Sequence, residues 1–68
     1  MTKEVYFFLS AEFNRGDCNE AEYRKRLRKA GANKDLIKKL IRMENEFFTG
    51  DAADYIVDAD KKIVDVQY

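Results

Sequence analysis

Apolar residues near the start of the chain alternate with other residues in a way that predicts a β-strand. Residues 5–9 are all β-branched, aromatic or aliphatic, and the alternation continues to Phe13. The residues expected on the core face are Val5, Phe7, Leu9, Ala11 and Phe13. The opposite face carries the rings of Tyr6 and Phe8, beside Ser10 and Glu12. We expect these two rings to be covered by another element or to form a binding surface.

The next segment predicts a short helix that begins near Asp17. Asp17 followed three residues later by Glu20 matches a capping box, in which each side chain bonds a backbone amide of the first turn. Apolar residues then recur at helical spacing, at Tyr23, Leu27 and Ala30. Gly31 stands where a left-handed residue ends a helix. The lone Cys18 would lie in the first turn, and we interpret it as a small buried residue.

A second helix is predicted to follow, with Asn33 as its N-terminal cap and Gly50 after its end. Its apolar stripe consists of Leu36, Leu40, Met43 and Phe47, flanked by Ile37, Ile41 and Phe48. This is the strongest helical pattern in the chain.

The last part of the chain predicts a β-hairpin over residues 54–59 and 63–68. A turn centred on Asp60 and Lys61 would pair Val57 with Val64 and Tyr55 with Val66. A four-residue loop that closes the hairpin one residue pair earlier would keep the same side chains on the same face of the two strands. The predicted order is therefore β-α-α-β-β, an α+β fold with a three-stranded sheet and a helical pair on one face. The chain of 68 residues is expected to be one domain, residues 1–68.

The composition excludes several kinds of catalytic and metal-binding site. The chain has no His and one Cys, so histidine-dependent catalytic relays, zinc sites with several Cys and His, and intrachain disulfides are excluded. The spacing of the aspartates fits no calcium loop. We predict no catalytic residues, no metal and no cofactor. The lone Cys, the lack of a signal-peptide pattern and the lack of a long apolar segment predict a cytoplasmic protein without a membrane span.

Charge is unevenly distributed although the net charge is zero. Residues 15–42 hold ten bases and four acids, whereas residues 43–68 hold two bases and seven acids. A basic helical pair with a Gly-containing turn resembles the helix-turn-helix of winged DNA-binding domains, with the terminal hairpin as the wing. The resemblance implies phosphate contacts from Arg24, Arg28, Lys38, Lys39 and Arg42. Residues 5–9 also resemble the first strand of an RNA-recognition sheet, but the matching second motif is absent.

The function expected first from these observations is protein binding without catalysis. The anchors would be Tyr6, Phe8 and Phe48, because aromatic side chains dominate interface energetics. Such a module would regulate or inhibit a larger protein, as small phage or mobile-element proteins do. The alternative is nucleic-acid binding through the basic helical pair. Because so small a core is marginal by itself, we also expect a homo-oligomer, for example a homodimer.

Overall fold

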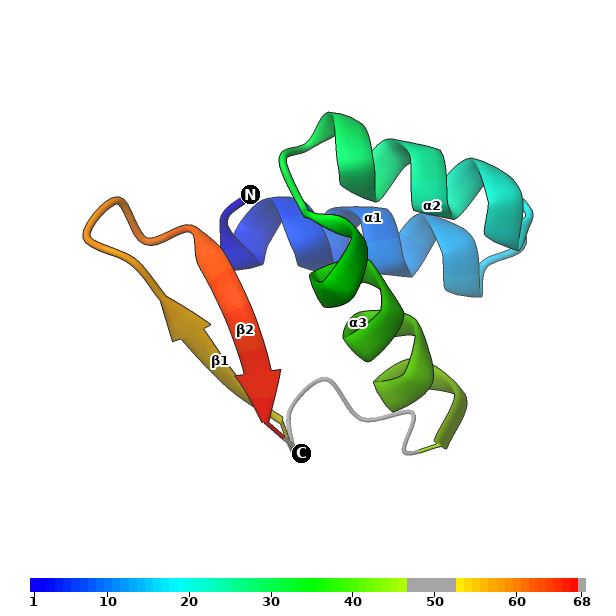
Figure 1. The fold of residues 1–68 in the computed structure, drawn as a ribbon. Coiled ribbons are helices and arrows are strands. Elements are labelled where there is room, and N and C mark those ends of the chain that lie inside the picture. Colours follow the sequence, from blue (N-terminus) through cyan, green and yellow to red (C-terminus); the bar gives the residue numbers. More distant parts are fainter. Residues whose placement is uncertain (47–52, 68) are drawn as a thin grey trace.

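The protein is a small α+β domain in which three helices precede a two-stranded antiparallel hairpin (Figure 1). The computed structural model describes residues 1–46 and 53–67. Its elements are α1 (Lys3–Asn14), α2 (Glu20–Lys29), α3 (Lys34–Glu46), β1 (Asp54–Val57) and β2 (Ile63–Gln67). The order is α-α-α-β-β, so the predicted β-α-α-β-β order and its three-stranded sheet are wrong. Phe47, Phe48 and Gly50 lie outside the described residues.

The error concerns α1, which occupies the segment predicted as a strand. Thr2 caps this helix, its hydroxyl accepting a hydrogen bond from the amide of Val5 at 3.3 Å. Tyr6, Leu9 and Phe13 follow at helical spacing and turn toward the core, with Tyr6 only 1% exposed. The same apolar segment thus fits both periods, and packing against the other helices selected the helix over the local β-propensity.

The structure confirms the other two predicted helices, but the N-terminal cap of α2 lies two residues later than predicted. The capping box of α2 is formed by Asn19 and Glu22, not by Asp17 and Glu20. Gly31 follows the end of α2 with a φ of 108°, a conformation that L side chains rarely adopt. Asn33 caps α3 as predicted, because its Oδ1 accepts from the amide of Leu36 at 2.8 Å.

The hairpin lies where the sequence predicts it, but β1 ends at Val57 and not at residue 59, and the register differs at the closed end. Tyr55 pairs with Val66 as expected, but Val57 pairs with Ile63 because a bulge follows Ile56. The loop is a tight turn ending in Lys61, whose φ is 62°. The start of the chain also touches the sheet, since the amide of Ile63 donates to the carbonyl of residue 1 at 2.8 Å.

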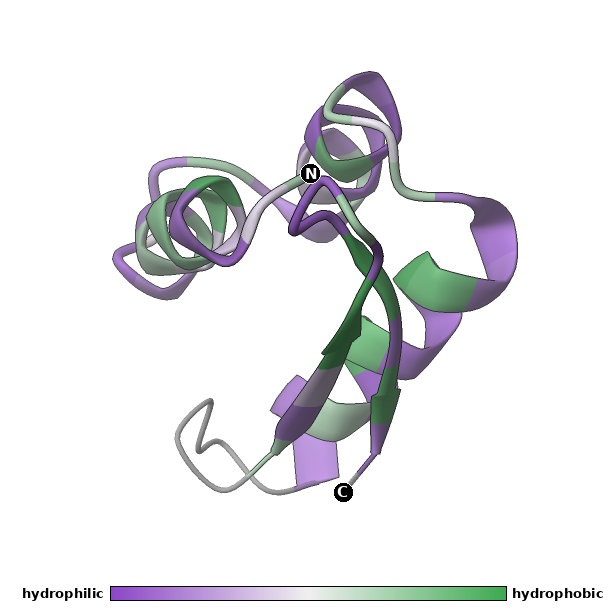
Figure 2. Ribbon diagram, turned by 90° about the vertical axis from the view of Figure 1, so that its left-hand side faces the viewer, coloured by the Kyte–Doolittle hydropathy of each residue, from purple (hydrophilic) through white to green (hydrophobic). Residues whose placement is uncertain are grey.

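The core lies where the three helices meet the inner face of the hairpin. Tyr23, Leu27 and Leu40 are fully buried at its centre. Seen from the left-hand side of Figure 1, α1 and α3 lie on opposite sides of the molecule (Figure 2). Within the described residues no helix is long and apolar enough to cross a membrane. The core thus places α3 between α2 and the hairpin, with one side of α3 open to solvent.

Candidate nucleic-acid interface

The open side of α3 is basic. The helix buries its apolar positions on one side, so the polar positions between them lie together on the other. Lys34, Lys38 and Arg42 follow one another at intervals of four residues and form a single row along the exposed side. Residues 30–33 connect this helix to α2, which is a helix-turn-helix spacing with a glycine in the turn.

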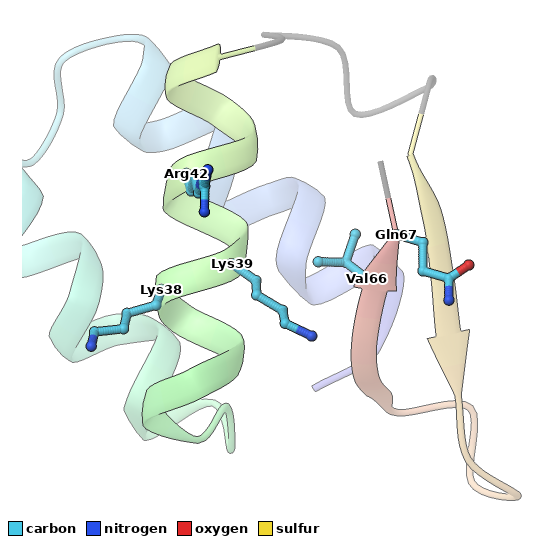
Figure 3. Close-up of a pocket in the computed structure, with 5 residues that line it drawn as sticks. All are labelled: Lys38, Lys39, Arg42, Val66 and Gln67. Carbon is cyan, nitrogen blue, oxygen red and sulfur yellow. The ribbon is translucent and has the colours of Figure 1, made fainter.

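Two neighbouring surface hollows share Lys38. One lies between α3 and β2, encloses about 710 Å³ and is lined by Lys38, Lys39, Arg42, Val66 and Gln67. Figure 3 shows Lys39 pointing from α3 toward β2 while Lys38 points the other way. The second hollow lies between α2 and α3, encloses about 230 Å³ and is lined by Arg24, Lys25, Arg28, Lys34, Ile37 and Lys38. We call the seven bases of both hollows the basic face. Its bases all lie on α2 and α3, and the first hollow reaches the hairpin through Val66 and Gln67 of β2.

Among the described residues, acidic side chains pair with three of the seven bases of the basic face, Arg24, Lys39 and Arg42. Glu46 accepts from Arg42 at 3.1 Å, and Glu20 lies 3.6 Å from Arg24. Asp65 accepts from Lys39 at 2.7 Å, and this hydrogen bond lowers the pKa of the Asp65 carboxyl. Among the described residues, no acid lies within ion-pair distance of Arg28 or Lys38 at the centre of the face.

Repulsion between like charges lowers the stability of α2 and α3, and nothing in the packing of the helices requires these charges. Arg24 and Arg28 on α2, and Lys34, Lys38 and Arg42 on α3, stand four residues apart with the same sign. Each such pair destabilises a helix by about 0.2–0.5 kcal/mol. The Glu20–Arg24 and Arg42–Glu46 pairs in the same rows offset part of this cost. A polyanion bound along the two rows would remove this repulsion.

All five bases predicted from the sequence lie on the basic face, exposed and around one pair of hollows. Sequence reasoning missed Lys25 and Lys34. Their spacing to Arg28 and Lys38, of three and four residues, is the signal that could have included them. That these bases contact phosphate remains a prediction.

The predicted aromatic anchors have separate outcomes. Tyr6 is buried, so its ring is excluded both as a surface anchor and as a platform for a nucleic-acid base. A strand period places this ring on the outer face, but residues 3–14 form a helix, whose period turns Tyr6 inward. Phe8 is 65% exposed and remains available for contact, and Phe48 lies outside the described residues. Phe7, assigned to the core, is 43% exposed and meets the ring of Tyr55 edge-on at 5.6 Å.

A buried carboxyl group joins the three helices behind the basic face. Glu44 of α3 accepts hydrogen bonds through Oε1 from Ser10 of α1 at 2.7 Å and from Tyr23 of α2 at 2.8 Å. Its other oxygen, Oε2, is buried and has no hydrogen-bond partner in the described residues. Burial, and then the charge of Glu44, raise the pKa of the Tyr6 and Tyr23 phenols. We assign this cluster to helix packing, because it lies in the core.

The remaining candidates offer little chemistry. Cys18 is buried, and the described residues contain no group of three His, Cys, Asp or Glu side chains placed to hold a metal ion. Comparisons with protein families, with curated proteins and with solved structures found no match.

Proposed function

We propose that the protein binds double-stranded DNA through the basic face. The observation that supports the proposal is a row of bases on α2 beside a row of bases on α3. Lys38 of the second row lines both surface hollows. In this arrangement α3 enters the major groove and α2 contacts the phosphates at the edge of the groove, as in helix-turn-helix proteins. The α3 helix of 13 residues is about 20 Å long, at 1.5 Å per residue.

The shape of the basic face favours DNA over RNA. The basic row lies on the exposed side of α3, and the DNA major groove is wide enough to admit a helix, whereas the major groove of duplex RNA is deep and narrow. The hairpin flanks α3 in the position of a wing (Figure 1). The proposed role is non-enzymatic and cytoplasmic, and it requires no cofactor.

The test is binding of a labelled duplex, followed by fluorescence anisotropy in a salt series. If the five predicted bases each neutralise one phosphate, the logarithm of the binding constant falls with that of salt concentration with a slope of about −4.5, at about −0.9 per contact. Lys38→Gln should weaken binding at low salt and make the slope shallower by about 1. Duplex RNA of the same length should bind more weakly.

The matched control is Lys3→Gln, which removes one positive charge from α1, outside the basic face and outside the hairpin. Both variants have the same net charge, so a general electrostatic attraction would affect them equally. Equal affinities for Lys38→Gln and Lys3→Gln, or no DNA binding at about 50 mM salt, would refute the proposal.

A second proposal keeps the protein-interaction role, as a regulator or inhibitor of a larger protein. The exposure of Phe8 on α1 favours it, because a large aromatic side chain on an outer helix face is typical of an interface anchor. A pulldown from cell lysate, compared with Phe8→Ala and with Lys38→Gln, separates the two roles. A protein partner lost with Phe8→Ala alone supports this role, and a partner retained by Phe8→Ala contradicts it.

A further inference from the structure

The outer face of α1 exposes apolar side chains that the fold does not cover. Phe8 is separated from the buried Tyr6 by two residues, or about 200° around the helix, and therefore points away from the core. Its neighbour Val5 is 43% exposed. An exposed Phe on the outer side of a helix has a cost in water that contact with another surface would remove.

The residues around Phe8 form a row whose two ends carry opposite charges. Glu4, Phe8, Ala11 and Arg15 are separated by four, three and four residues, which keeps them on one side of α1, and all four are exposed. The order along the row is acid, large apolar, small apolar, base. Such a row is complementary to itself when reversed.

We propose that this face of α1 is the interface of a two-fold homodimer, in which α1 of one copy packs antiparallel against α1 of the other. With the symmetry axis between Phe8 and Ala11, Phe8 lies against Ala11 of the second copy, where the small side chain leaves room for the ring. Glu4 then faces Arg15 of the second copy at both ends of the interface. A two-fold interface requires this self-complementary arrangement.

The pairing is compatible with the intrachain contacts of these residues. Arg15 contacts Asp17 of its own chain at 2.9 Å on the protein surface, with both side chains more than half exposed, so its guanidinium retains free donors. Phe8 makes none of the ring contacts that Phe7 makes with Tyr55. One pair of short helices buries less than the roughly 1,200 Å² of a stable interface, so the dimer is a weak one that forms at high protein concentration.

The basic face stays open in this dimer. Because α1 and α3 lie on opposite sides of each copy (Figure 2), pairing through α1 leaves both α3 helices on the outside. Dimerisation is measured without nucleic acid, so its failure and the failure of the proposed DNA binding are distinguishable.

The experiment is sedimentation equilibrium over a wide concentration range, with a monomer mass of 8.0 kDa as reference. The wild-type chain should approach twice this mass at the highest concentrations. Phe8→Ala should raise the dissociation constant at least about tenfold, because it removes two buried rings from each dimer. The matched control Val64→Ala, which trims an exposed apolar side chain on β2, should leave the constant unchanged.

Charge reversal tests the antiparallel geometry itself. Glu4→Arg alone places like charges opposite Arg15, and Arg15→Glu alone places like charges opposite Glu4, so each variant should remain monomeric. An equimolar mixture of the two should form a heterodimer, because opposite charges face each other again at both ends. Circular dichroism of each variant checks that it is folded.

Three results would overturn the proposal. The first is a wild-type chain that is monomeric at every concentration. The second is a dimer that Phe8→Ala does not weaken, and the third is a mixture of the two charge-reversed variants that stays monomeric.

Discussion

The hydrogen bond between Tyr23 and Glu44 allows a quantitative test of how the three helices are held together. Tyr23→Phe removes the hydroxyl that donates to Oε1 at 2.8 Å and leaves the ring in place, stacked on Phe13 with centroids 4.4 Å apart. The variant therefore isolates the polar contact from the packing contact. Ser10 remains as a hydrogen-bond donor to the carboxyl group, and the Tyr6 hydroxyl also interacts with Glu44.

The expected loss follows from the burial of both partners. A hydrogen bond to a charged group contributes about 1.5–3 kcal/mol, and we place the loss in this range because Tyr23 is fully buried and Glu44 is 9% exposed. For a domain of this size each kcal/mol changes the melting temperature by about 4–8 °C. Tyr23→Phe should therefore lower the melting temperature by roughly 10 °C.

The decisive assay is a double-mutant cycle with Glu44→Met, followed by thermal and urea unfolding. Methionine has a similar length and adapts to the space that the glutamate occupies. In the Glu44→Met background the Tyr23 hydroxyl has lost its acceptor, so Tyr23→Phe should be neutral or stabilising there. If Tyr23→Phe costs the same in both backgrounds, the Tyr23–Glu44 hydrogen bond does not carry the effect and the reasoning is refuted.

Two further predictions concern the tyrosines and the turn before α3. Because the folded pKa values of Tyr6 and Tyr23 lie above the unfolded value of about 10, the stability they contribute is complete below pH 10. It falls above pH 10 by about 1.4 kcal/mol per pH unit for each group. In a variant with Tyr55→Phe and Tyr68→Phe, which keeps only Tyr6 and Tyr23 of the four tyrosines, tyrosinate absorbance should appear only as the chain unfolds. Tyrosinate absorbance with a folded circular dichroism spectrum in that variant would contradict this. Gly31→Ala should cost about 1–2 kcal/mol because of the positive φ, although a Cβ there would meet the Met1 nitrogen at an ordinary 3.5 Å. An unchanged urea midpoint would show that the turn adapts without strain.

Local signals in the sequence determined α2, α3 and the hairpin. Gly31 and Asn33 mark the turn between the helices because a left-handed residue and a side-chain cap satisfy the free backbone groups of helix ends. The basic face was predicted for a similar reason, since a spacing of four residues places Lys38 and Arg42 on the same side of any helix. The capping box of α2 was misplaced by two residues, because Asp17 and Asn19 both suit a cap and both are followed by Glu three residues later.

Only the tertiary structure decided what residues 3–14 form, and with it the fold. The aromatic and β-branched residues of this segment favour a strand locally, but Tyr6, Leu9 and Phe13 also match the helical period. As a helix, this segment buries Tyr6 beside α2 and α3 and brings Ser10 to Glu44. Phe8 is turned to the surface by the same choice. A period of two and a period of 3.6 place different side chains on the inner face, and long-range packing against α2 and α3 determined which period the chain adopts.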